Sequence, residues 1–283
     1  MQSAVWGNRQ MKLAYFGMGL LTVALAAGSV LVVGHTPARA ASDVDSRDVG
    51  YPAVVVELFT SEGCSSCPPA DALLAKLAEQ SPVGGVQVLA LEEHVDYWND
   101  QGWFDPFSSH EWTVRQNEYA SALGNGNPYT PQMVVDGSVE FVGSRGQQAL
   151  KSLAEAAQRP KVTVTVSEAN SNKSGKENFA VTVGKLSDVT KAGTPEVWLA
   201  ITESGLHNAV KGGENVGHEL HHAAIVRSMR KIGEAKGTGD TSFSAETTIP
   251  INHEWKRENL RAVVFVQEKK SLRIVGAAQI SLH

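Results

Sequence analysis

The first part of the chain alternates between short apolar runs and amphipathic segments. The valine-rich run Pro52–Phe59 predicts a buried strand, and Val86–Leu91 predicts a second one. Between them, Pro68 and Asp71 suit the first turn of a helix, and apolar residues recur at helical spacing as far as Gln80. The pattern therefore predicts strand, helix, strand.

Three further signals complete this α/β pattern. Helical periodicity runs from Glu111 to Leu123 and again from Gln147 to Gln158. Between these helices, Asp136-Gly137 is flanked by two strand-like runs, which is a hairpin signal. The predicted order is strand, helix, strand, helix, strand, strand, helix.

Beyond Pro160 the periodicity changes to strict alternation. Further strands are expected around Val162–Val166, Phe179–Val183, Val197–Ile201, Ser242–Ile251, Arg261–Gln267 and Arg273–Leu282. Short alternating runs separated by Gly, Asn and Ser indicate a β-sandwich-like module. We therefore predict a boundary near Arg159, between a domain at 41–159 and a β domain at 160–283.

The N-terminus has the three parts of a secretory signal peptide. Arg9 and Lys12 precede the apolar run Leu13–Gly34, and Ala38-Arg39-Ala40 follows. Cleavage is expected after Ala40, which makes 1–40 the signal. The 22-residue run could also span a bilayer as an uncleaved N-terminal anchor. In both cases the rest of the chain is periplasmic or secreted, and only this segment would tether it to a membrane.

The charge balance excludes one class of partner. The 283 residues carry a formal net charge of −5. Phosphate binding needs clustered Lys and Arg, so we expect no nucleic acid partner. A content of 42% hydrophobic residues is ample for buried cores.

The chain has two cysteines, Cys64 and Cys67. A disulfide between them would close a loop of two residues and remove little entropy from the unfolded chain. The pair is therefore expected to serve chemistry rather than stability. The pair lies where the first strand gives way to a helix, and free N–H groups at a helix N-terminus lower the pKa of a thiol. We expect Cys64 to be exposed and to attack, and Cys67 to be more buried and to resolve.

Two features of the chain resemble the thioredoxin superfamily. One is the segment between a strand and a helix, Gly63-Cys64-Ser65-Ser66-Cys67-Pro68, and the other is Thr130-Pro131 before a hairpin. The resemblance implies a thioredoxin-like N-terminal domain followed by the β-sandwich-like domain. It also implies that Pro131 follows a cis peptide bond and that Thr130 and Pro131 bind the client backbone.

A wider pattern is similar to the exported DUF1223 family. It consists of ELFTSEGCSSCPPAD, Thr-Pro-Gln before the hairpin and a downstream GGEN segment, within about residues 50–283. This resemblance implies a thioredoxin-like fold more strongly than it implies a reaction.

The chain departs from thioredoxin at two points. The dipeptide between the cysteines, Ser65-Ser66, differs from Gly-Pro, so the direction of electron flow stays open. The buried acid that thioredoxin keeps six residues before its first cysteine is replaced by Leu58. Glu57, one residue further back, is the candidate proton acceptor.

Two other segments also suggest a site, and each has a simpler interpretation. The segment His218-Glu219-Leu220-His221-His222 matches the zinc-protease pattern H-E-x-x-H. It lies in the part expected to be β, where its first and last histidines would be some 13 Å apart, so we expect a solvated or loosely metal-binding histidine cluster. The aromatic stretch Tyr97–Trp112 is expected either to pack over the sheet or to form a groove for a client.

These features together predict an exported thiol–disulfide oxidoreductase. Cys64 and Cys67 would exchange disulfides with a protein client, and a redox partner protein would supply or accept electrons, with no dissociable cofactor. Two alternatives remain: a copper- or zinc-binding module that uses the same cysteines, and a non-catalytic interaction protein on the same scaffold. Outside the cysteines, no metal ligand is assigned.

Overall fold

The structure is a computed structural model of the 283-residue chain. It describes residues 51–80, 83–124, 126–169, 175–186, 189–190, 193–236 and 239–282. The predicted signal peptide lies outside the described residues. Among the residues that are described, no helix combines the length and the apolar character needed to cross a bilayer.

The described part is a mixed α/β fold with few helices and a large mixed sheet. The helices are α1 (Pro68–Gln80), α2 (His110–Leu123), α3 (Gly146–Ala157) and the 3-10 turn η1 (Arg257–Asn259). The strands before α3 are β1 (Ala53–Thr60), β2 (Gln87–His94), β3 (Gln132–Val135) and β4 (Val139–Val142). The strands after α3 are β5 (Val164–Glu168), β6 (Lys176–Gly184), β7 (Glu196–Glu203), β8 (Leu206–Ala209), β9 (Glu219–His222), β10 (Ile225–Glu234), β11 (Thr241–Pro250), β12 (Leu260–Gln267) and β13 (Ile274–Ser281).

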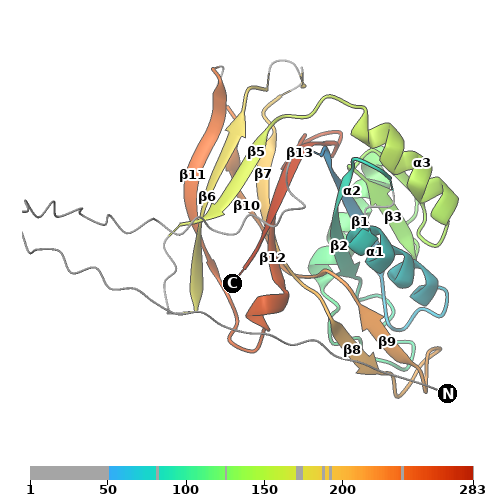
Figure 1. The fold of residues 1–283 in the computed structure, drawn as a ribbon. Helices are drawn as coiled ribbons and strands as arrows, with labels where there is room; N and C mark the ends of the chain where they lie inside the picture. Colours follow the sequence, from blue (N-terminus) through green and yellow to red (C-terminus); the bar gives the residue numbers. More distant parts are fainter. Residues whose placement is uncertain are drawn as a thin grey trace, which may run out of the picture. The chain divides into compact units, whose positions relative to one another are not determined.

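Eight strands form the large sheet, in the order β13-β12-β7-β10-β2-β1-β3-β4 (Figure 1). β1 and β2 are parallel neighbours, as expected for two strands joined by a helix, and β3 pairs antiparallel with β1. A second sheet contains β11, β6 and β5, and a separate hairpin contains β8 and β9. The helices and strands predicted before residue 160 are confirmed to within a few residues.

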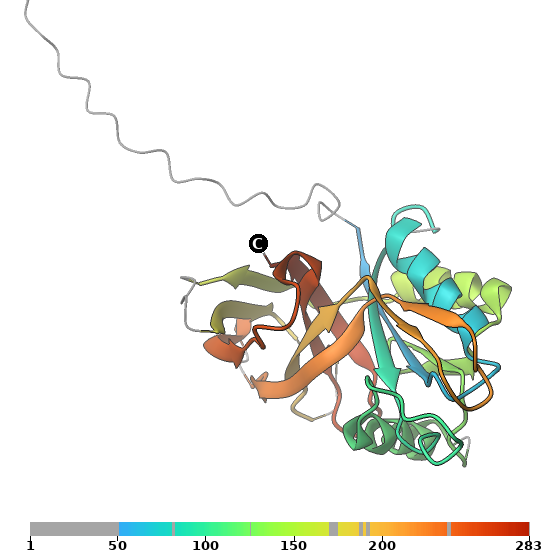
Figure 2. The ribbon, with the colours of Figure 1, turned by 90° about the horizontal axis from the view of Figure 1, so that it is seen from below.

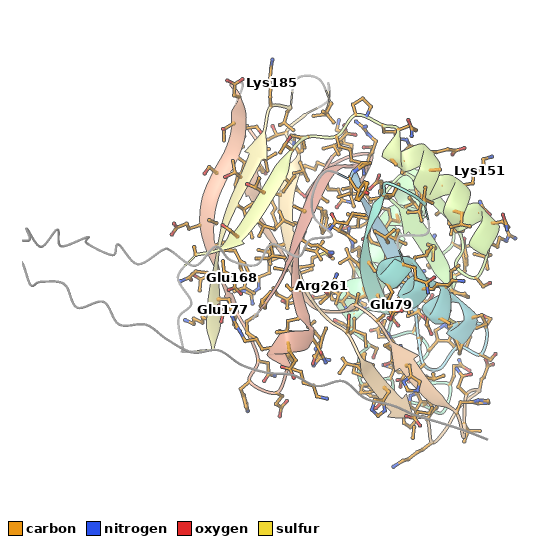
Figure 3. The ribbon with its side chains drawn as sticks, in the orientation of Figure 1. Glu79, Lys151, Glu168, Glu177, Lys185 and Arg261 are labelled. Atoms are coloured by element: carbon orange, nitrogen blue, oxygen red, sulfur yellow. A yellow bond between two sulfur atoms is a disulfide. The ribbon has the colours of Figure 1, made fainter. Side chains whose placement is uncertain are left out.

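The two faces of the sheet are covered differently. Alternate residues of β1, namely Val54, Val56 and Leu58, pack with apolar residues of α1 and α3. Val55 and Phe59, which point the other way, pack with α2. Figure 2, a view from below Figure 1, shows α1 and α3 on one side of the strands and α2 on the other, and Figure 3 shows Lys151 of α3 pointing away from the sheet. The three-stranded sheet packs on β7, β12 and β13 through a third apolar cluster.

The structure differs from the predicted arrangement of two modules. The boundary near Arg159 falls between α3 and β5, but the large sheet contains strands from both sides of it. All described residues belong to one compact unit, Ser42–His283. The joining strand, β10, has irregular register at Val226/Ser228 and at Lys231/Gly233. These irregularities break the alternation by which a strand is recognised in sequence, so the link between the two halves was not predicted.

The hairpin of β8 and β9 is an insertion between β7 and β10. It contacts α1 and lies beside that helix in both ribbon views (Figures 1 and 2). The hairpin therefore brings residues from late in the chain to the segment that contains the cysteines.

Candidate functional site

The cysteines lie in the segment that connects β1 to α1. Cys64 and Cys67 form a disulfide with an S–S distance of 2.13 Å. The carbonyl of Cys67 accepts the N–H groups of Ala70 and Asp71 at 2.8 and 3.1 Å, which begins the helix. Pro68 suits this first turn because its missing N–H would have no partner there. The local structure around the cysteines thus follows from the sequence.

The prediction that Cys64 is exposed is wrong. Both cysteine side chains are 0% exposed, while Ser65 and Ser66 between them are exposed. The cysteines are buried because a loop from a later part of the chain covers them, and no local sequence pattern predicts this contact. The loop Val210–His218, which joins β8 to β9 and is called the strap below, lies against the cysteine loop.

Two strap residues hold this cover in place. The carboxylate of Glu214 accepts hydrogen bonds from the backbone N–H and the hydroxyl of Ser65, at 3.1 and 2.6 Å. The amide of Asn215 donates to the carbonyls of Glu62 and Cys64, at 2.9 and 3.0 Å. The bonds from Ser65 lower the pKa of Glu214. These residues belong to the GGEN segment, so the structure gives that motif a place over the cysteines.

The glycines of the same motif fit the strap against a second loop. A Cβ on Gly212 would lie 2.2 Å from the carbonyl oxygen of Gly102, and one on Gly213 would lie 3.1 Å from Cβ of Trp103. Gly213 also has a positive φ of 68°. Side chains at these positions would therefore push the strap away from the loop at 99–109.

The residues predicted to bind a client lie at the start of β3. The peptide bond between Thr130 and Pro131 is cis, as expected from the sequence. The register of β3 pairs Gln132 with Phe59, which sets Pro131 beside the end of β1. The hydroxyl of Thr130 accepts a hydrogen bond from the indole of Trp98 at 2.8 Å.

The structure does not bring Glu57 to the cysteines. Glu57 alternates with Val56 and Leu58 on β1, so its side chain lies on the face covered by α2, opposite α1. There it accepts hydrogen bonds from Arg115 at 2.6 Å and from the hydroxyl of Tyr119 at 2.5 Å. Glu57 thus belongs to a buried ion-pair network on the far face.

A buried carboxyl does lie on the cysteine side. Asp71 is 4% exposed and follows Cys67 by four positions, so the two residues share one face of the helical turn. Its carboxylate accepts a hydrogen bond from the hydroxyl of Thr60 at 2.6 Å. Burial and the nearby Glu92 raise the pKa of Asp71 to about 7.

Next to Asp71 lies a cluster of acids and imidazoles that the sequence analysis missed. We call it the His–carboxylate cluster, and all of its side chains are buried. Its members are Glu62, Glu92, His94, Asp105 and His222.

Each imidazole of this cluster is bound by a carboxylate at both nitrogens. His94 contacts Asp105 through Nδ1 at 2.7 Å and Glu92 through Nε2 at 3.2 Å. His222 contacts Glu92 through Nδ1 at 2.7 Å and Glu62 through Nε2 at 3.1 Å. Glu92 therefore sits between the two rings, and Asp105 and Glu62 hold their outer nitrogens.

The pKa values of the cluster follow from these contacts. Burial by itself would lower the pKa of both imidazoles, but the carboxylates outweigh it. They raise the pKa of His94 well above its usual value and that of His222 to about 9. Burial opposes ionisation of Glu92 and Asp105, yet their bonds to the imidazoles lower both pKa values.

The H-E-x-x-H segment accounts for one of these imidazoles. Glu219–His222 is the strand β9, not a helix, so the zinc-protease arrangement is absent from this segment. Alternation along β9 exposes His221 and buries His222. The expectation of a solvated cluster is therefore wrong for His222, although it holds for His218 and His221.

The aromatic stretch mostly covers the site. The indole of Trp103 donates to Glu62 at 2.8 Å, and the ring of Phe107 lies 5.6 and 5.5 Å from those of His94 and His222. Trp112 belongs to α2 and is buried in the apolar cluster between that helix and the sheet. Phe104 is 70% exposed. Tyr97 is also exposed. Packing over the sheet is therefore confirmed for Trp98 and Trp112, and the groove for a client stays a prediction.

Comparison with known proteins identifies a family and a fold. A family model described as "Protein of unknown function (DUF1223)" matches residues 55–267. A crystal structure of a protein from Agrobacterium tumefaciens is similar, with 28% identity, a TM-score of 0.59 and coverage of 82% of this chain and 95% of that chain. HBP35 of Porphyromonas gingivalis is similar in fold, with 16% identity, a TM-score of 0.62 and coverage of 82% and 76%. No curated protein matches the chain.

Proposed function

The chain belongs to the DUF1223 family, whose function is unknown, and on that premise we propose that it is an exported thiol–disulfide exchange protein. Its reactive centre is the Cys64–Cys67 pair, within a thioredoxin-like arrangement of β1, α1, β2 and β3. Residues 1–40 direct export. A protein client and a redox partner protein are its two substrates.

The observation that carries this proposal is the setting of the disulfide. The pair stands between a strand and a helix N-terminus, where backbone N–H groups stabilise a thiolate. Pro131 immediately precedes the neighbouring strand β3 and lies beside the end of β1. A bridge that closes so short a loop adds little stability, so the two thiols are more useful for exchange than as a structural brace.

The exchange is a balanced two-electron step. A client thiolate attacks Sγ of Cys64, a mixed disulfide forms, and Cys67 leaves as a thiolate. The second client thiolate then attacks the client sulfur of that mixed disulfide, so the client gains a disulfide and Cys64 leaves as a thiolate. The protons released by the two client thiols are taken up by the two cysteines. The reverse sequence reduces a client disulfide, with Cys64 attacking and Cys67 resolving.

Asp71 is the residue best placed to exchange a proton with Cys67. It shares the helical face of that cysteine, is buried, and has a pKa of about 7. Asp71 thus replaces Glu57 as the candidate proton acceptor, because Glu57 lies on the opposite face of the sheet. The strap must move before a client reaches Cys64, because Asn215 covers the carbonyl of that residue.

The proposal is tested by the reduction potential of the pair in the full chain, measured by mass-resolved alkylation in graded glutathione buffers. We expect one reversible two-electron transition between about −120 and −270 mV, the range of known exchange proteins. Two matched single-cysteine variants follow. C67A should trap mixed disulfides with client proteins, whereas C64A should not. A pair that stays oxidised throughout these buffers, or equal trapping by both variants, would refute exchange at this centre.

A further inference from the structure

We propose that Glu92, His94 and His222 form a binding site for a divalent transition metal ion, a site that does not include the cysteines. The ligand atoms of these three residues lie within 4.8 Å of one another, and all three side chains are buried. Two imidazoles and one carboxylate are the ligand set that zinc, iron(II) and related ions take in proteins.

The distances suit one ion. Oε1 of Glu92 lies 3.2 Å from Nε2 of His94 and 2.7 Å from Nδ1 of His222. Ligand atoms about 2.0–2.2 Å from a shared ion lie roughly 3–3.5 Å apart. Small rotations of the three side chains would therefore place all of them around one ion.

The imidazole nitrogens that face away from Glu92 give an independent argument for a metal site. Metal-bound histidines almost always donate their other nitrogen to a carboxylate or carbonyl, which fixes the ring. Asp105 occupies that position for His94 at 2.7 Å, and Glu62 occupies it for His222 at 3.1 Å. The backbone N–H of Ala223 binds Oε2 of Glu92 at 2.8 Å and leaves Oε1 facing the rings.

Glu62 and Asp105 are themselves fixed by neighbours. Glu62 also accepts from Asn208 at 3.0 Å and from Trp103 at 2.8 Å. Asp105 accepts the backbone N–H groups of Glu62 and Phe107, both at 2.9 Å. Such support is what holds ligands in a preformed site.

The charges of the His–carboxylate cluster are also compatible with a bound metal ion. Three buried carboxylates face two imidazoles, and the ion pairs these carboxylates make within the described residues are all with those rings. Buried carboxylates need compensating charge. One divalent ion bound by the rings would supply the same two positive charges as protons on both of them.

The test is zinc binding to the full-length chain with its disulfide intact. We expect chelator-treated protein to bind one equivalent of Zn²⁺ by calorimetry and to gain thermal stability on binding. The variants H222N and E92Q, which each remove one metal ligand and keep a polar side chain, should weaken binding by at least about tenfold.

The control is His221→Asn. His221 is adjacent on β9 but exposed, and with His207 it flanks Glu219 on the outer face of the hairpin. H221N should bind Zn²⁺ as the unaltered chain does. Binding that is lost in H221N and kept in H222N would overturn the proposal in favour of the outer face.

A second measurement needs no variant. Co²⁺ added to the oxidised chain should give the visible absorption of nitrogen and oxygen ligands, without the intense near-ultraviolet bands of cysteine thiolate. Thiolate bands, or no binding of either ion by folded chain, would overturn the site. The result is independent of the exchange reaction, which the reduction potential tests separately.

Discussion

At the scale of single residues, alternation along strands decides which groups can do chemistry. Glu57 and Leu58 are neighbours on β1 but point to opposite faces, and only the face of Leu58 is covered by α1. In the same way His222 reaches Glu92 at 2.7 Å while its neighbour His221 is exposed. A shift of one position therefore moves a side chain to the other face of the strand and changes its partners and its exposure.

The raised pKa of Asp71 predicts how the stability of the protein depends on pH. This pKa is raised from 3.8 to about 7, so the folded state binds the proton more tightly than the unfolded state does. Stability contributed by this group is complete below pH 3.8 and is lost as the pH rises through 7. D71N removes the charge, so we expect it to stabilise the protein above pH 7 by at most ~4 kcal/mol.

The measurement is urea denaturation of both chains in chelator at a series of pH values. The gain should shrink between pH 7 and 4 and disappear below that range. The same variant should slow resolution by Cys67 and let the mixed disulfide of Cys64 accumulate. A gain that does not change with pH would show that Asp71 is not the group responsible.

At the scale of elements, the β8–β9 hairpin supplies both the cover of the cysteines and one imidazole of the His–carboxylate cluster. Glu214 and Asn215 of the strap make four hydrogen bonds to Ser65, Glu62 and Cys64. The strap can thus control access to the disulfide through contacts that are not covalent.

We predict that the strap slows reduction of the disulfide, and the double variant E214A/N215A tests this. Each hydrogen bond contributes on the order of 1 kcal/mol, so removing the strap contacts should speed reduction of the disulfide by a small thiol at least about tenfold. Alkylation time courses resolved by mass give the rate. V216A is the matched control, because Val216 is 58% exposed in the same loop. Equal rates in E214A/N215A and the unaltered chain would mean that the strap does not limit access.

At the scale of the whole molecule, the eight-stranded sheet makes the two halves of the described chain depend on each other. β2 lies between β1 and β10, which belong to different halves. Leu89 and Leu91 of β2 pack with Val263 and Phe265 of β12. A cut near residue 159 would expose this apolar face of β2 and remove both His222 and the strap.

We therefore expect the full chain to unfold in one transition, with circular dichroism and tryptophan fluorescence giving the same midpoint. A chain that ends at residue 159 should lack a cooperative transition and should aggregate, because an unpaired buried strand is exposed. A cooperative transition in that shorter chain would instead support the two independent domains expected from the sequence.

The sequence by itself determined the local features of this protein. Helical periodicity, valine-rich runs, the hairpin signal at Asp136-Gly137 and Cys-x-x-Cys before a helix all depend on residues close together in the chain. The cis bond before Pro131 was expected from the resemblance to the thioredoxin superfamily, and the structure has it. Local patterns report backbone preference and the face that each residue presents, so these features could be predicted.

Only the tertiary structure decided what surrounds the cysteines. Asn215 lies 151 positions from Cys64, and His222 lies 130 positions from Glu92, yet each pair is in hydrogen-bond contact. These contacts arise because β10 joins the large sheet next to β2 and carries the β8–β9 hairpin to the cysteine side. No local period encodes such a pairing, since it depends on the free energy of assembling the whole sheet.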